Sequence, residues 1–201
     1  PMQLLIRCNA GAVPGSSWTL DEGVGGGRWV GEGCHFVALA CTLVGALPSS
    51  VCAFAARREN AALGSENVAA QVLFDDGSTA QILYTALGDR AIEKERIEVY
   101  AGGVVGTIED FRKYTLAVSG KLLTKKSVGQ DKGQSALLRT FISGCRGRDL
   151  ALVTDRMLEA TRATLEAAAV LSRGCGGGAA HRGAGGASRA ASRRTCSRSR
   201  R

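Results

Sequence analysis

Residues 67–84, NVAAQVLFDDGSTAQILY, decide how this chain folds, because they contain two strand patterns and the turn between them. Apolar side chains alternate with polar or small ones from Val68 to Phe74, which is the period of a half-buried strand. Asp75-Asp76-Gly77 then supplies a tight turn, and residues 79–84 return with similar alternation. The stretch predicts an antiparallel β-hairpin.

Further strand patterns lie on both sides of this hairpin. Two of the connections between them are short turns, at Gly102-Gly103 and at Ser119-Gly120. The other predicted strands are residues 3–8, 50–56, 95–100, 104–108, 114–118 and 121–124. Because most of the strands are joined by short turns, we expect a largely antiparallel sheet.

The apolar period changes to that of a helix in three places. From Glu32 the apolar residues recur at helical spacing until Gly45 supplies a stop. Residues 133–145 predict a second helix, and Thr154-Asp155 is a plausible N-cap for a third, with Gly174 just past its end. The apolar face of the second helix is Leu137, Leu138, Phe141, Ile142 and Cys145. The expected buried face of the third helix is Leu158, Thr161, Leu165 and Ala168.

Together these patterns predict an α+β fold, in which a largely antiparallel sheet carries helices on one face. The other face of such a sheet needs cover, which points to a partner domain or a partner subunit. We assign this domain to residues 1–173. Residues 174–201 consist mainly of Gly, Ala, Ser and Arg without a large apolar side chain, so we expect a disordered basic tail there.

The positive charge of the chain is concentrated in that tail. The formal net charge is +8, yet seven of the 26 basic residues and none of the 18 acidic ones fall within residues 174–201. Residues 1–173 are therefore nearly neutral, and binding to nucleic acid would rest on the tail alone. The tail has no aromatic side chain on which a base could stack, so we expect no nucleic-acid partner.

The seven cysteines are odd in number and include no CxxC pair, which fits neither a disulfide framework nor a zinc site. Cys34, Cys41, Cys52 and Cys145 have apolar neighbours, and we expect them to be small buried side chains. The first residues lack the pattern of a signal peptide, and the apolar stretch 37–47 is too short for a membrane helix. We therefore expect a cytoplasmic protein with no membrane partner.

The candidate functional residues gather around the glycine cluster 25–27, which runs into the first predicted helix. Glu32 and His35 follow it, and a carboxylate with an imidazole can transfer a proton near neutral pH. Arg28 and Asn9 are candidates for binding substrate hydroxyls or a carboxylate. The alternative is structural, with Asn9 and Arg28 stabilising turns and His35 serving as a hydrogen-bonding residue at a helix end.

Other charged motifs are interpreted as structural. Asp131-Lys132 is expected to cap the second helix and form a charge pair, and residues 93–96 to be a solvated strand end. Asp75-Asp76 serves a turn, so we predict no metal site. No GxGxxG motif follows a predicted strand, so we also predict no dinucleotide site.

Five short motifs follow one another along the chain. They are Asn9-Ala10-Gly11, GGGRWVGEGCHF at 25–36, FDDGS at 74–78, KERIEV at 94–99 and QDKG at 130–133. In this order they resemble the Gfo/Idh/MocA oxidoreductases, a family that includes glucose–fructose oxidoreductase and inositol dehydrogenase. The resemblance extends over roughly residues 3–172 and is specific to the C-terminal domain of that family.

This resemblance implies a place in a two-domain enzyme. The family binds NAD(P) on an N-terminal Rossmann domain, and its C-terminal α+β domain uses an open sheet for substrate binding and oligomerisation. His35 matches the histidine that acts on the substrate hydroxyl, whereas Gly31 and Ala38 stand where the family has aspartates. Glu32, one position away, could substitute for the first of them. The family's junction lysine would precede residue 1.

The function implied is that of one domain, the substrate-binding and oligomerisation domain of an NAD(P)-dependent oxidoreductase. Its substrate would be a sugar, cyclitol or related polyol. We expect the chain to bind no cofactor alone, to be inactive alone, to need a Rossmann partner domain and to form a homo-oligomer through its sheet. The alternative is a non-catalytic α+β scaffold that only self-assembles or binds a partner domain.

Overall fold

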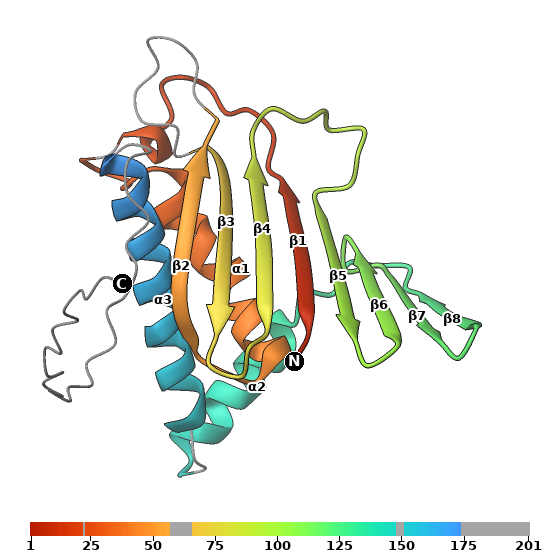
Figure 1. Cartoon of the computed structure of the whole chain (residues 1–201). Coiled ribbons are helices and arrows are strands. Elements are labelled where there is room, and N and C mark those ends of the chain that lie inside the picture. The colour runs from red at the N-terminus through yellow and green to blue at the C-terminus, as the bar shows by residue number, and fades with distance from the viewer. Residues whose placement is uncertain (22, 57–65, 148–150, 174–201) are drawn as a thin grey trace, which may run out of the picture.

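The computed structural model of this chain describes residues 1–21, 23–56, 66–147 and 151–173. Within them, helices pack on one face of an eight-stranded sheet, which confirms the predicted α+β fold (Figure 1). The tail predicted for residues 174–201, and with it the cap predicted at Gly174, lies outside the described residues.

The strands lie at or within two residues of the positions that the sequence predicts. They are β1 (Gln3–Asn9), β2 (Pro48–Ala55), β3 (Asn67–Phe74), β4 (Thr79–Thr85), β5 (Glu95–Ala101), β6 (Val104–Glu109), β7 (Lys113–Val118) and β8 (Lys121–Lys126). Their order across the sheet is β2-β3-β4-β1-β5-β6-β7-β8. Neighbouring strands are antiparallel except β1 and β4, which run parallel. The sheet is therefore largely antiparallel, as predicted, with one parallel pair inserted at its centre.

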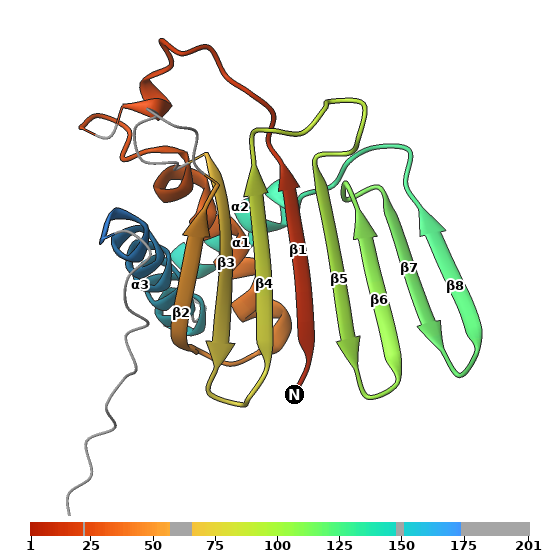
Figure 2. The same ribbon diagram turned by 45° about the horizontal axis from the view of Figure 1, so that its top comes forward.

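The helical elements are η1 (Trp18–Leu20), α1 (Arg28–Val44), α2 (Gln134–Cys145) and α3 (Ala151–Arg173). α1 leads from β1 to β2, two strands that point the same way, and lies with α3 on one face of the sheet. Figure 2 shows these helices behind β2, β3, β4 and β1, whereas no described helix covers β5 to β8. None of the described helices is long and apolar enough to cross a membrane.

The core lies between α1, α3 and the helix-facing side of the sheet. Ile6 of β1 and Val72 of β3 are fully buried there. The Trp29 ring of α1 meets the Tyr84 ring of β4 edge to face, with centroids 6.5 Å apart. The Trp29 indole nitrogen Nε1 also donates to the backbone oxygen of Thr164 in α3, at 3.1 Å. One aromatic side chain thus joins both helices to the sheet.

The face that α3 buries differs from the predicted one. Leu158 and Leu165 are 63% and 50% exposed, and Thr161 is exposed as well, whereas Ala168 is partly buried. The buried residues of this helix are Ala160, Ala163, Thr164 and Ala167. Their small side chains let α3 approach α1 and β2 closely, which bulky leucines would prevent. The sequence predicted a helix here, but α3 begins at Ala151, so Thr154-Asp155 lie within it and are not its N-cap. The predicted buried face was also wrong, because the prediction ranked residues by hydrophobicity rather than by size.

α2 forms where the sequence predicts it, but none of its residues is buried. Its apolar residues Leu137, Leu138 and Phe141 are 59% to 67% exposed. The amphipathic pattern therefore predicted the helix correctly, but its apolar face is not covered by the described residues.

The burial of the cysteines was only partly predicted. Cys41 is buried on α1 and Cys34 is half-buried, but Cys52 and Cys145 are exposed. Cys52 is exposed because it lies on the helix-free face of the outermost strand β2, and Cys145 because α2 is unburied. These four cysteines and the buried Cys8 all have free thiols.

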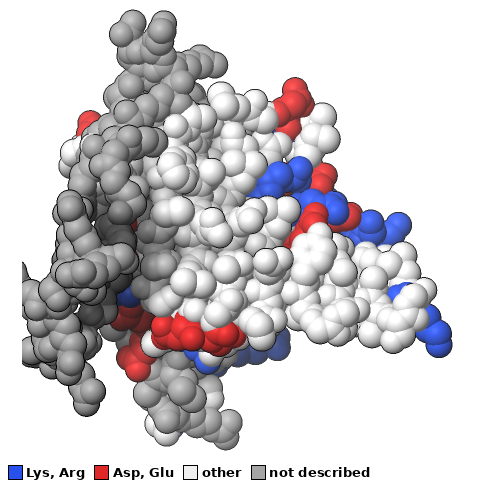
Figure 3. Space-filling view, viewed as in Figure 1, with Lys and Arg blue, Asp and Glu red and all other residues white. Residues whose placement is uncertain are grey.

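The face of the sheet opposite the helices is open, and Figure 3 shows it largely without charge. Leu5, Leu73 and Leu83, which come from three adjacent strands of this face, are 40% to 43% exposed. Phe54 on β2 and Tyr100 on β5 extend the apolar surface. The sequence-based expectation of an uncovered sheet face is confirmed for the described residues.

The packing of α1 yields a test that uses two glycines of the same helix. A Cβ on Gly33 would lie 2.9 Å from the buried Trp29 ring, whereas nothing lies within 4 Å of a Cβ on Gly31. Gly33→Ala should therefore lower the free energy of unfolding by roughly 1 to 2 kcal/mol, because the ring cannot move aside. Gly31→Ala should raise it by up to about 1 kcal/mol through helix propensity. Urea unfolding followed by circular dichroism measures both changes, and equal effects at the two positions would contradict this packing.

Candidate active site

The candidate site lies at one edge of the sheet, where the parallel strands β1 and β4 both end (Figure 1). Ligands of open sheets bind outside the carboxyl ends of such strands. Asn9 is the last residue of β1, and α1 begins with Arg28 close to the same edge. Topology thus brings residues distant in the sequence to one place.

The glycine cluster before α1 is required by the backbone. A Cβ on Gly25 would lie 2.6 Å from the backbone oxygen of Trp18, and Gly27 caps the helix with a φ of 82°. α1 starts at Arg28, four residues before the predicted start, because these glycines allow the chain to enter the helix sharply. The cluster follows η1 rather than a strand, so it lacks the context of a dinucleotide-binding turn. This cluster therefore does not fit the pyrophosphate of NAD(P).

Arg28 is buried, with 4% of its side chain exposed. Its Nη1 donates to the backbone oxygen of Gly11 at 2.7 Å, and its guanidinium carbon lies 5.3 Å from the centroid of the Tyr84 ring. It also forms ion pairs with Glu32 at 3.5 Å and with Glu66 at 3.9 Å. These contacts favour the structural alternative for Arg28, which ties the segment after β1 to α1 and to the start of β3.

Glu32 is half-buried at the centre of a small charged cluster. One carboxylate oxygen faces Nη2 of Arg28 at 3.5 Å, and the other faces Nζ of Lys94 at 3.8 Å. Both distances are longer than those of a charge-assisted hydrogen bond. The Glu32 carboxylate is therefore held between two cations without a short contact to either.

The Tyr84 side chain completes the cluster from the sheet side. It is fully buried between the rings of Trp29 and Phe36, whose centroids lie 6.5 Å and 6.2 Å from its own. Its hydroxyl is also buried and interacts with the Glu32 carboxylate. Burial, together with the adjacent Glu32 carboxylate, raises the pKa of Tyr84 above its usual range. The hydroxyl therefore stays protonated and can act as a donor.

Cys8 pairs with Tyr84 across β1 and β4 and lies beneath the same cluster. Burial raises the pKa of its thiol to about 11, against an opposing effect of Lys94. Cys8 is therefore a small buried side chain rather than a nucleophile.

The charged stretch 93–96 is not a solvated strand end throughout, as the sequence analysis expected. Lys94 faces Glu32, and the Glu95 side chain is 8% exposed and pairs with Lys132 at 2.7 Å. Asp131 accepts a hydrogen bond from the backbone nitrogen of Gly133 at 2.9 Å, just before α2. The pairing predicted for Lys132 is thus observed, but the predicted cap is not, because the N-cap position of α2 is Gly133 and Asp131 stabilises the turn before it.

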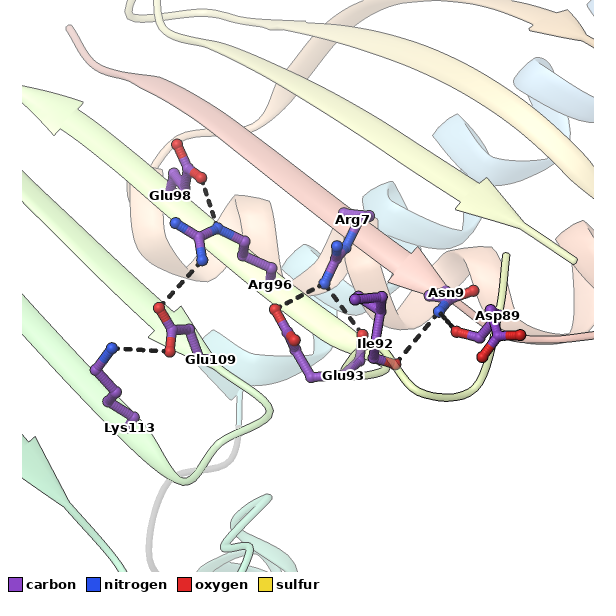
Figure 4. Close-up of polar contacts among 9 residues, drawn as sticks. All are labelled: Arg7, Asn9, Asp89, Ile92, Glu93, Arg96, Glu98, Glu109 and Lys113. Carbon is purple, nitrogen blue, oxygen red and sulfur yellow. Dashed lines mark hydrogen bonds and ion pairs between the residues drawn. The ribbon is translucent and has the colours of Figure 1, made fainter. Parts of the chain in front are cut away.

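Asn9 contacts the loop before β5, as Figure 4 shows. Its Nδ2 donates to the backbone oxygens of Asp89 and Ile92 at 2.7 Å and 3.3 Å. Its Oδ1 is packed so closely against Gly88 that a Cβ there would lie 2.0 Å away. Asn9 therefore fixes the loop before β5, which is the turn-stabilising role of the alternative reading.

His35 is exposed on α1, about one turn after Glu32. Within the described part of the chain it makes no hydrogen bond or ion pair. The structure thus brings Arg28 and Glu32 together, but no contact joins His35 or Asn9 to them.

Sequence reasoning missed Tyr84, Lys94 and Glu66, which complete the cluster. Tyr84 could have been noticed as the last inward-facing residue of the 79–84 pattern, but only the fold reveals its proximity to Glu32. The described residues include no group of three or more metal-binding side chains.

Residues 3–109, more than half of the chain, match the family model of the GFO/IDH/MocA C-terminal domain. The chain therefore belongs to the Gfo/Idh/MocA family. No curated protein sequence matches the chain.

Solved structures of oxidoreductases share the fold. The aldose-aldose oxidoreductase of Caulobacter crescentus in complex with glycerol superposes with a TM-score of 0.68 at 17% identity, covering 86% of this chain and 53% of that one. The UDP-N-acetylglucosamine 3-dehydrogenase GnnA of Acidithiobacillus ferrooxidans gives 0.66 at 13%, covering 84% and 52%. Levoglucosan dehydrogenase in complex with NADH gives 0.65 at 15%, covering 85% and 56%. The chain thus spans about half the length of these enzymes.

The environment of Cys8 predicts how the thiols react. With the Cys8 pKa near 11 and the side chain fully buried, iodoacetamide at about pH 8 should modify it at least ~100-fold more slowly than the exposed Cys52. Peptide mass spectrometry of a time course measures both rates, and in urea the difference should largely disappear. Equal rates in the folded protein would contradict the buried position of Cys8.

Proposed function

We propose that this chain is the substrate-binding and oligomerisation domain of an NAD(P)-dependent oxidoreductase that acts on a hydroxyl or ketone of a sugar, cyclitol or related polyol. The family match over residues 3–109 carries this proposal. The charged cluster around Glu32 supports it, because carboxylates and cations at a sheet edge are suited to binding hydroxyl groups.

A separate Rossmann domain would supply the nicotinamide, since the glycine cluster before α1 lacks the context of a dinucleotide-binding turn. This division of labour is consistent with the chain spanning about half of the NADH-bound levoglucosan dehydrogenase. Alone, the chain would bind substrate without turning it over, because no hydride acceptor would be in place.

His35 remains our candidate for the group that accepts the proton of the substrate hydroxyl, with Glu32 beside it on α1. Its exposure on α1 is compatible with contact to a substrate held between two domains. Arg28 and Asn9 would act indirectly. Arg28 would hold Glu32 in place, and Asn9 would fix the loop that carries Lys94.

The open face of the sheet would serve self-association. It combines an apolar area on β2, β3, β4 and β1 with charges on β5 to β7 that are already paired (Figure 4). Arg96, for example, contacts Glu98 at 2.7 Å and Glu109 at 3.1 Å. Paired charges can be covered by a second copy without leaving an isolated ion, whose burial would be strongly unfavourable.

The alternative function, a non-catalytic scaffold, draws on the structural roles of Arg28 and Asn9. It would keep the self-association of the sheet but bind no polyol. A binding experiment on the chain alone separates the two.

Saturation-transfer NMR with glycerol and myo-inositol should detect binding to the chain. Under the same conditions the chain should leave the fluorescence of NADH unchanged. Absence of any polyol binding would favour the scaffold, and tight NADH binding by the chain alone would contradict the proposed division between domains.

Self-association can be tested on the same protein. Leu73→Glu places a charge on the open face between Ser50 and Thr79 and should weaken association at least about tenfold, because neither neighbour can pair with the buried carboxylate. Leu165→Glu on the exposed side of α3 is the matched control and should leave association unchanged. Sedimentation velocity reports both. A monomeric wild-type chain, or equal weakening by the two substitutions, would contradict the proposed interface.

A further inference from the structure

The helix-facing side of β5 to β8 carries an apolar groove. The strand registers place Val99, Gly106, Leu116 and Leu123 in one row across these four strands, on the same side as the buried Ile97. The groove has a volume of about 420 Å³, and Leu116 and Leu123 beside it are 41% and 60% exposed. α1 and α3 cover this side of β2 to β4, whereas no described helix covers the groove (Figure 2).

Gly106 is a second indication that the groove has an occupant. It lies in the middle of β6 without a positive φ, and a Cβ there would meet only Leu116 among the described residues, at 4.0 Å. Neither the backbone nor the packing of the described residues therefore requires glycine, although glycine weakens a strand. A glycine within a strand often marks the close approach of another molecule. The groove is thus suited to side chains that come from outside the chain.

The backbone of the sheet decides which kind of segment fits. The backbone groups of β5, β6 and β7 already pair with a neighbouring strand on each side. An extended segment lying across them would leave its own N–H and C=O groups unpaired, whereas an α-helix pairs these groups internally. α1 and α3 cover the other half of the sheet in this way. The groove therefore fits a helix.

The charge around the groove is positive. Residues 113–126 contain four lysines and no carboxylate. Lys121 and Lys125 flank Leu123 on the groove side of β8, and both are exposed and form no ion pair with a described residue. Carboxylates beside the apolar stripe of a bound helix would complement these two lysines. The α2 helix of a second copy is a poorer fit, because α2 carries Arg139 and no acidic residue.

We propose that this groove binds an acidic amphipathic helix of a partner protein. The apolar stripe of that helix packs over Gly106 between Val99 and Leu116, and its carboxylates pair with Lys121 and Lys125. The groove lies on the opposite side of the sheet from the face proposed for self-association, so both contacts can form at once.

The test uses two fluorescein-labelled peptides of about 18 residues, each with leucine at positions i, i+3, i+4 and i+7 of a helix. One peptide has glutamate and alanine at the other positions, and the second has lysine in place of glutamate. Fluorescence anisotropy should show that the wild-type chain binds the glutamate peptide at least about tenfold more tightly than the lysine peptide.

Lys125→Glu and Lys126→Glu form a matched pair of variants. The two lysines are neighbours on β8, but Lys125 lines the groove and Lys126 lies on the other side of the sheet, opposite Lys113. Lys125→Glu should weaken binding of the glutamate peptide at least about tenfold, because it places like charges next to each other. Lys126→Glu makes the same change in net charge and should weaken binding much less.

Gly106→Val tests the groove itself. Its side chain fills the hollow and should also weaken binding of the glutamate peptide at least about tenfold. The midpoint of urea unfolding should stay the same or rise, because nothing lies close to a Cβ at this position and valine favours a strand.

Three results would overturn the proposal. The wild-type chain could bind neither peptide, or Gly106→Val could leave the affinity unchanged, which would place the peptide elsewhere on the chain. Equal weakening by Lys125→Glu and Lys126→Glu would mean that only net charge matters. If Gly106→Val instead abolishes self-association in sedimentation velocity, a second copy fills the groove and the assignment to an acidic partner is wrong.

Discussion

The parallel pairing of β1 with β4 is the constraint on which the rest of this structure depends. β1 enters between β4 and β5, so it runs alongside a strand that comes about 70 residues later in the chain. β2 points the same way as β1, and the chain can reach it only by crossing one face of the sheet, which is what α1 does. The same pairing brings the ends of β1 and β4 and the start of α1 to a single edge.

That edge carries charges buried to different degrees, and each degree suits a different role. Arg28 is almost inaccessible and binds a backbone oxygen, so it behaves as part of the framework. Glu32 and Lys94 are partly accessible and only loosely paired, so their positions are fixed less tightly than that of Arg28. The Tyr84 ring belongs to the core, and its buried hydroxyl interacts with Glu32.

Much of the architecture could be predicted from local sequence. Alternation and turn residues predicted the strands, and the predicted 67–84 hairpin is observed, with Val68 opposite Tyr84. The parallel pair was not predicted, because turn chemistry only informs about strands that follow one another. The buried face of α3 was misjudged because alanines there are selected for close approach to α1, a contact that has no signature within the helix itself.

The site was harder to predict than the fold for a related reason. Glu32 and Arg28 are four residues apart on one helix, so their proximity follows from helical geometry. Lys94 and Tyr84 join them from other elements, and their role depends on which face of a strand or loop they occupy. Lys94 and Glu95 are adjacent in sequence yet pair with different elements, Glu32 of α1 and Lys132 before α2. The interpretation of residues 93–96 as one solvated strand end could not reveal these two different partners.

The hydrogen bond from Trp29 to Thr164 affects how the protein folds during its synthesis. Its partners are 135 residues apart, so the helix layer stays incomplete until nearly the whole domain has left the ribosome. Until then the apolar side of α1 that faces α3 and the edge strand β2 lack their cover. The nascent chain therefore exposes apolar surface on the side of the sheet that the helices later cover. The folded domain exposes apolar surface on the opposite side. For that interval both faces are open to unwanted association.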